Sequence, residues 1–171
     1  GVLSFSGTTF NGTVGTGRFI AVDQTVADVD KYGADPSGVS ISTSAFNRAV
    51  ASNHALKLNA GLYVVSEITI NGNVVTGMGT ASTTVKAAAG ASYTIRLANH
   101  SNATYGWATK VLRDFTINGN SKTSDGIVWG SALSPELSLA WMLEGLNIID
   151  CNRGLYKPYG NIGNTFNKLQ I

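Results

Sequence analysis

The carboxylate side chains in the second half of the chain are the residues with the clearest capacity for chemistry. Hydrolysis of a glycosidic bond needs two Asp or Glu side chains at a set separation, one as the acid and the other as the base or nucleophile. Several carboxylates lie on or beside recurring apolar segments of this chain. We take three of them as candidate catalytic residues: Asp125, Glu136 and Glu144.

Glu144 also has a structural interpretation. It occupies the same position in its apolar segment as Arg113 does in the preceding one. Equivalent residues on neighbouring strands lie about 5 Å apart. The pattern therefore predicts an outward ion pair between Arg113 and Glu144, and an exposed pair of this kind contributes little to stability. This interpretation is favoured over a catalytic one for Glu144.

Aromatic side chains gather in the same half of the chain. Flat rings with a polar tip suit the faces of sugars, and they equally suit a subunit interface. Trp107 and Trp141 border two predicted insertions, at 99–109 and 131–140, so we predict both as candidate substrate-binding residues. Trp129 follows two apolar residues and is a candidate for the core.

Other classes of site have little support in the sequence. His54 and His100 are isolated, and Cys151 is the single cysteine, so no spacing typical of metal ligands occurs. We expect no metal and no cofactor. The net charge is +2 with no basic cluster, which argues against a nucleic-acid partner. No apolar run approaches the length of a membrane span, so no membrane association is expected.

A repeated apolar template predicts the architecture that would position these residues. The segments 112–117, 143–148 and 166–171 share it, and they recur after 31 and 23 residues (143 − 112 and 166 − 143). Repeats of about 20–30 residues indicate a solenoid. Alternate residues within each segment point inward. We therefore predict that residues 56–171 form an all-β parallel β-helix.

A short amphipathic segment precedes these strands. The spacing predicts an α-helix over 43–52, with Ser42 or Thr43 as its N-terminal cap. We expect Phe46 and Val50 to be buried against the first coil, so that the helix covers the end of the solenoid. Its apolar stripe consists of Ala45, Phe46, Ala49 and Val50.

The segment before this helix carries a family resemblance. Residues 31–39 read Lys-Tyr-Gly-Ala-Asp-Pro-Ser-Gly-Val, and a Gly-Leu-Tyr strand follows at 61–63. This order resembles the opening segment of right-handed parallel β-helices of the pectate-lyase-like superfamily, above all bacteriophage tailspikes. Many members have Asp-Asp-Thr after the Gly-Val, where this chain has Ser-Ile-Ser-Thr at 40–43.

The resemblance implies an organisation and a function. Residues 1–28 would form an N-terminal arm or neck, and 29–171 the start of a β-helix domain that is truncated at its C-terminal end. The protein would be a tailspike fragment that binds bacterial surface polysaccharide, whether capsule, O-antigen or exopolysaccharide. Its parent would be a depolymerase acting by hydrolysis or lyase chemistry. It would lie on the extracellular virion as a homotrimer, with its N-terminal side on other phage tail proteins.

Two alternatives stay open. One is a secreted bacterial polysaccharide lyase or glycoside hydrolase of the β-helix class. The other is a structural virion or adhesin stalk without activity. Two features of the sequence favour the trimer: charged residues make up only 13% of the chain, and 19–22 form an apolar arm that three copies could pack around one axis.

Overall fold

The fold is that of a computed structural model. It describes residues 2–5, 8–11, 26–52, 55–70, 74–98, 110–129, 138–139, 141–157, 161–162 and 165–171. Beyond the solenoid described below, β1 (Val2–Phe5) and β2 (Thr8–Asn11) form an antiparallel pair. Two further short strands, β14 (Ser138–Leu139) and β18 (Asn161–Ile162), pair in parallel. Among the described residues, no helix is long and apolar enough to cross a membrane.

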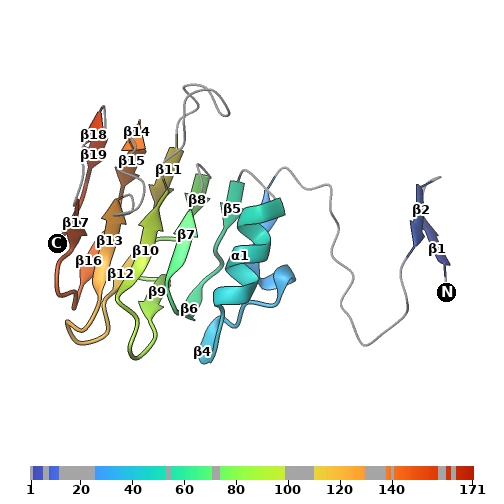
Figure 1. Cartoon of the computed structure of the whole chain (residues 1–171), viewed down its shortest axis with the longest axis horizontal. Helices are drawn as coiled ribbons and strands as arrows, with labels where there is room; N and C mark the ends of the chain where they lie inside the picture. The colour runs from blue at the N-terminus through green and yellow to red at the C-terminus, as the bar shows by residue number, and fades with distance from the viewer. Residues whose placement is uncertain are drawn as a thin grey trace.

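Three parallel sheets form the walls of the molecule (Figure 1). The six-stranded sheet contains β3 (Ala27–Asp28), β5 (Ala55–Lys57), β8 (Val74–Thr76), β11 (Lys110–Arg113), β15 (Trp141–Glu144) and β19 (Thr165–Asn167). The five-stranded sheet contains β4 (Ser37–Ile41), β6 (Gly61–Val65), β9 (Thr83–Ala87), β12 (Thr116–Asn118) and β16 (Asn147–Ile149). The four-stranded sheet contains β7 (Ile68–Ile70), β10 (Tyr93–Leu97), β13 (Asp125–Trp129) and β17 (Leu155–Tyr156).

The chain visits the six-, five- and four-stranded sheets in turn, and each strand pairs in parallel with the strand one coil away. This confirms the predicted parallel β-helix. The predicted template is also in register, because Leu112 pairs with Leu143, and Leu143 pairs with Phe166. Ile117 pairs with Ile148 in the neighbouring sheet. Among the described strands, the first parallel pairing is that of β3 with β5, with Ala27 opposite Leu56.

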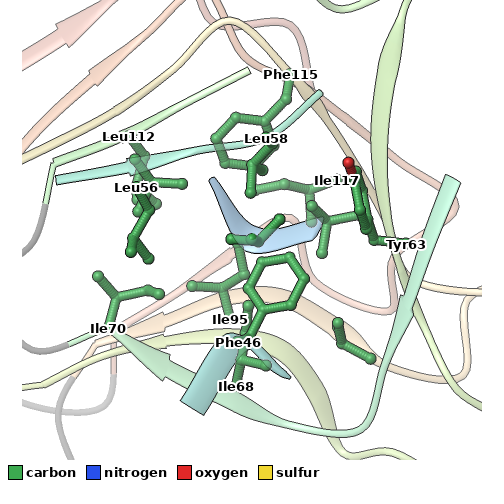
Figure 2. Packing of buried hydrophobic residues seen from close by; sticks show 14 of the residues in the cluster. Phe46, Leu56, Leu58, Tyr63, Ile68, Ile70, Ile95, Leu112, Phe115 and Ile117 are labelled. Atoms are coloured by element: carbon green, nitrogen blue, oxygen red, sulfur yellow. The ribbon is translucent and has the colours of Figure 1, made fainter. Parts of the chain in front are cut away.

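Inward side chains from the three walls fill the solenoid. In β6, β7, β9 and β15 a buried residue alternates with a more exposed one; in β7, for example, Ile68 and Ile70 are buried and Thr69 is half-buried. Figure 2 shows the side chains of the three sheets pointing toward one another. The core is therefore a stack of columns, each of which adds one apolar residue per coil. The column of the five-stranded sheet consists of Tyr63, Val85, Ile117 and Ile148.

The predicted helix is confirmed as α1 (Thr43–Ser52). In the first coil it follows β4 and precedes β5, so it takes the place that a strand of the four-stranded sheet takes in later coils. Phe46 is buried, and Val50 is partly buried against the core. The hydroxyls predicted as caps accept bonds from N–H groups outside the helix: Ser42 from Asp35 (2.9 Å) and Thr43 from Ser66 (2.6 Å). They therefore tie the helix to the adjacent loops.

A short 3₁₀ helix, η1 (Val29–Tyr32), is fastened to the first coil by a polar network. The Tyr63 hydroxyl donates to the Asp30 carboxylate at 2.8 Å. The Asn59 amide donates to Asp28 (3.0 Å) and to Asp30 (2.8 Å). Burial, followed by the Asp30 carboxylate, raises the pKa of Tyr63, so the phenol keeps its proton and stays a donor.

The loop before β4 is organised by Asp35. Its carboxylate accepts bonds from the Ser37 amide (2.9 Å), the Ser37 hydroxyl (2.6 Å) and the Ser40 amide (2.7 Å). These bonds, that of the Ser37 hydroxyl first, lower the pKa of Asp35 to about 2 from 3.8. The Asp-Pro-Ser-Gly motif therefore encodes a carboxylate-centred turn.

Acid should loosen this turn at an unusually low pH. Because the folded pKa lies below the unfolded one, the stabilisation by the Asp35 carboxylate is present above pH 3.8 and is lost as the pH falls through about 2. We expect the amide resonances of Ser37 and Ser40 to shift with a midpoint near pH 2. The Asp35→Ala variant should lack this transition, and a midpoint near 3.8 in the native chain would contradict the role of the turn.

Candidate functional site

The bend between the six- and five-stranded sheets has the same backbone geometry in successive coils of the later part of the chain. Asp114, Gly145 and Lys168 all have left-handed backbone, with φ of 61°, 56° and 50°. The bends stack through backbone bonds, from Asp114 to the Glu144 carbonyl (3.1 Å) and from Gly145 to the Asn167 carbonyl (3.0 Å). The residue just before each bend therefore recurs at the same place on the wall.

Those residues form what we call the axial polar column: Lys57, Thr76, Arg113, Glu144 and Asn167. Each is the last residue of its strand and is paired in register with the next. In the first four members the residue before it, such as Leu112 or Leu143, is buried, so the column lies on the outer face of the six-stranded sheet. Asn167 continues the column by its register with Glu144. The column presents one polar side chain per coil, about 4.8 Å apart.

Contacts inside the column correct one prediction. Arg113 and Glu144 are register partners as expected, but they do not form an ion pair. The Arg113 Nε donates to the Thr76 hydroxyl at 3.1 Å and lies 4.0 Å from the Asp114 carboxylate. Glu144 accepts from the Asn167 amide at 3.0 Å. Each of the two side chains has turned to the coil on its other side, where a better-placed partner is available.

A second polar cluster surrounds Asp125. The guanidinium of Arg153 makes a bidentate contact with this carboxylate, at 2.9 Å and 2.5 Å, and the Asn152 amide adds a third bond at 3.1 Å. Asp125 is only 5% exposed, whereas Arg153 is about half-exposed and lies over the Tyr156 ring. Asp125 therefore joins two coils, and its oxygens are engaged by protein donors.

Cys151 lies beside this cluster and is half-buried. Burial raises the pKa of its thiol to about 11, so the thiol is protonated near neutral pH. Because the thiolate is the nucleophilic form, Cys151 is not activated in this arrangement. In the part of the chain that the structure describes, no group of His, Cys, Asp and Glu could hold a metal ion.

Two of the predicted catalytic residues, Asp125 and Glu144, lie on different sheets of the described part of the chain. Asp125 begins a strand of the four-stranded sheet, whereas Glu144 ends a strand of the six-stranded sheet. The Trp141 side chain is 1% exposed, so it would have to become accessible before it could contact a saccharide. Glu136 and Trp107 lie outside the described residues. Their catalytic and substrate-binding roles stay predictions.

Sequence reasoning missed three members of the axial polar column: Lys57, Thr76 and Asn167. A signal for Asn167 was present, since it follows Phe166 just as Arg113 follows Leu112 and Glu144 follows Leu143. Lys57 and Thr76 gave a weaker signal because their coils do not carry the full template. As a whole, the column offers hydroxyl, amide, carboxylate and cationic groups, which can hydrogen bond to a polar polymer that lies along the solenoid axis.

Comparison with known proteins supports the fold. No protein-family model matches the chain, and no curated protein matches its sequence. Among solved structures it is similar to the A-module of the Azotobacter vinelandii mannuronan C-5 epimerase AlgE4, with a TM-score of 0.66 at 20% identity over 83% of this chain and 43% of that one. The AlgE6 A-module of the same organism gives 0.67 at 19% identity over 83% and 42%.

A viral protein is also similar. ORF18 of Geobacillus virus E2 matches with a TM-score of 0.58 at 18% identity, over 74% of this chain and 26% of that one. The chain thus spans less than half the length of each of these three structures. At these identities the likeness shows the parallel β-helix fold.

Proposed function

We propose that this chain is part of a phage tailspike that binds bacterial surface polysaccharide. The axial polar column is the observation that carries the proposal. It supplies a continuous row of hydrogen-bonding side chains along the solenoid, at the spacing of single coils. A linear saccharide, with hydroxyl groups on every ring, is a polymer whose donors and acceptors such a row can match.

Two structural similarities support a polysaccharide ligand and a viral protein. The epimerase modules, by their name, act on mannuronan, which is a polysaccharide, and they use the same fold. The third similar structure comes from a virus. In our proposal the capsule, O-antigen or exopolysaccharide of a host bacterium lies along the column, and the protein acts outside the cell on the virion.

The assembly we propose is a homotrimer whose N-terminal side contacts other phage tail proteins. Exposed apolar side chains at that end support this arrangement. β4 is the edge strand of its sheet, and on it Val39 is 87% exposed and Ile41 is 60% exposed. The apolar arm at 19–22, also expected to contribute, lies outside the described residues.

Light scattering should give three times the mass of one chain. A monomer at high concentration would contradict the trimer.

The activity of the parent is a separate part of the proposal. A depolymerase, whether hydrolase or lyase, should release new reducing ends from the bound polysaccharide, and a structural stalk should not. A secreted enzyme of the same fold should release them as a monomer. Oligomeric state and reducing-end release, measured together on the full-length parent, therefore separate the three alternatives.

Binding is tested with purified capsule, O-antigen and exopolysaccharide by biolayer interferometry. We expect one of them to bind, and an Arg113→Ala/Glu144→Ala variant to bind about tenfold more weakly, because two hydrogen-bonding groups are lost. Lys31→Ala removes an exposed charge from η1 and should bind normally. The proposal fails if the column variant and the native chain bind equally well, or if no polysaccharide binds.

A further inference from the structure

Arg96 differs from the other arginines of the described ranges in its lack of a polar partner. It is the fourth residue of β10 and lies between the buried residues Ile95 and Leu97, so it belongs to the outer face of the four-stranded sheet. Its Nε is buried and has no hydrogen-bond partner. The other described arginines each have a polar partner: Arg48 the Tyr32 carbonyl, Arg113 the Thr76 hydroxyl and Arg153 the Asp125 carboxylate.

The guanidinium of Arg96 is already held in place. Its central carbon lies 4.4 Å from the centre of the Tyr93 ring, which is itself buried. Stacking on an aromatic face restricts the side chain, so less conformational freedom would be lost when a ligand binds. The group is therefore a fixed, planar donor whose charge no described carboxylate balances by an ion pair.

The surroundings of Arg96 form a second column on this sheet. In register with it lie Thr69 on one side and Val128 followed by Tyr156 on the other. Tyr156, two strands away at about 10 Å, carries the Arg153 guanidinium on its ring. Arg153 is neutralised by Asp125, so the uncompensated positive charge of this face lies at Arg96.

One carboxylate of this neighbourhood is engaged elsewhere. Glu67 accepts the backbone N–H of Ser92 at 2.8 Å and makes no ion pair with Arg96. A planar guanidinium matches a carboxylate in a two-point contact, and Arg96 is half-buried, so part of its side chain faces solvent. An incoming carboxylate at the part of the guanidinium that faces solvent would supply the missing charge.

We propose that Arg96 anchors a subsite for the carboxylate of an acidic sugar on the outer face of the four-stranded sheet. The assignment of this subsite to a sugar rests on the proposed polysaccharide binding, and it adds that the bound polysaccharide is acidic. It lies on a different wall from the axial polar column, so the two can be tested separately. The neighbouring Thr69 and Tyr156 side chains would contact the rings on either side of the acidic one.

The test is an NMR titration of the whole chain that follows the Nε–Hε resonance of Arg96 and, in the native chain and the variants alike, the backbone amide resonance of residue 96. D-glucuronate is the probe, with D-glucose as its neutral counterpart. We expect a saturable shift with glucuronate and none with glucose. Arg96→Gln should weaken glucuronate binding at least tenfold. Arg96→Lys should bind with intermediate affinity, since a point charge lacks the planar fork.

Arg48→Gln is the matched control, because it removes an arginine from the exposed face of α1. It should leave glucuronate binding unchanged. Equal responses to glucose and glucuronate, or an unchanged affinity in Arg96→Gln, would overturn the subsite. A stronger response to a glutamate-rich peptide than to glucuronate would overturn its assignment to a saccharide. Glucuronate binding at Arg96 without binding of any surface polysaccharide would leave the subsite standing and count against the tailspike role.

Discussion

Replacing Phe46 with alanine is expected to lower the free energy of unfolding by about 3–5 kcal/mol. The Phe46 side chain is 1% exposed and meets the Tyr63 ring edge-on, with the ring centres 5.8 Å apart. It extends from α1 into the first coil (Figure 2). Alanine would leave a cavity between the helix and the columns of the core, because the rigid coil behind it cannot collapse to fill the space.

Urea denaturation followed by tryptophan fluorescence measures this loss, since Trp129 and Trp141 are both buried in the later coils. Asn47→Ala is the control on the same helix. Asn47 is exposed, so its replacement should change the free energy of unfolding by no more than about 0.5 kcal/mol. A loss below about 1 kcal/mol for Phe46→Ala would mean that α1 does not act as a cap.

Replacing Gly77 with alanine is expected to cost about 2–4 kcal/mol. Gly77 lies in the bend after β8, against the backbone of the next coil. A Cβ atom there would overlap the Asp114 carbonyl oxygen and lie 2.7 Å from the Phe115 Cβ. The two coils are also joined at this bend by N–H bonds from Gly77 to Arg113 (3.0 Å) and from Gly79 to Asp114 (2.8 Å). Moving the bend to relieve the overlap would weaken both.

Gly90→Ala separates this effect from the general cost of replacing a glycine. Gly90 has a φ of 82°, but a Cβ added to it would have no atom within 4 Å. Its replacement should therefore cost only the strain of a left-handed residue, about 1–2 kcal/mol. Thermal and urea denaturation of the two variants provide the comparison. If both lose the same stability, close packing between coils is not what requires glycine at position 77.

The alternation of strand residues explains which side chains could be assigned to the inner or the outer face from the sequence alone. Leu143 is inward in the repeated template, and strand residues alternate between faces. Trp141 is two positions earlier and must therefore share the inward face, while Glu144 must point outward. Both assignments agree with the structure. The role of Trp141 in saccharide binding relied instead on the predicted insertion beside the residue, and it stays a prediction.

Pairings that depend on coil length could not be read from the sequence. Leu56 pairs with Val75 after 19 residues, and Val75 pairs with Leu112 after 37 (75 − 56 and 112 − 75). Bends between sheets absorb such differences without changing the register, so a fixed spacing does not reveal the partner. The positions of Lys57 and Thr76 in the axial polar column follow only from the paired strands.

The sequence by itself determined the fold class, the span of α1 and its buried stripe, since these depend on local periodicity and on short-range turn chemistry. The tertiary structure alone decided the partners of the polar side chains. Arg113 turned to Thr76, Asp125 was engaged by Arg153, and Arg96 was left stacked on Tyr93 without an acceptor. The physical reason is that each coil offers several donors and acceptors at similar distances. The choice among them depends on side-chain directions that only the assembled coils fix.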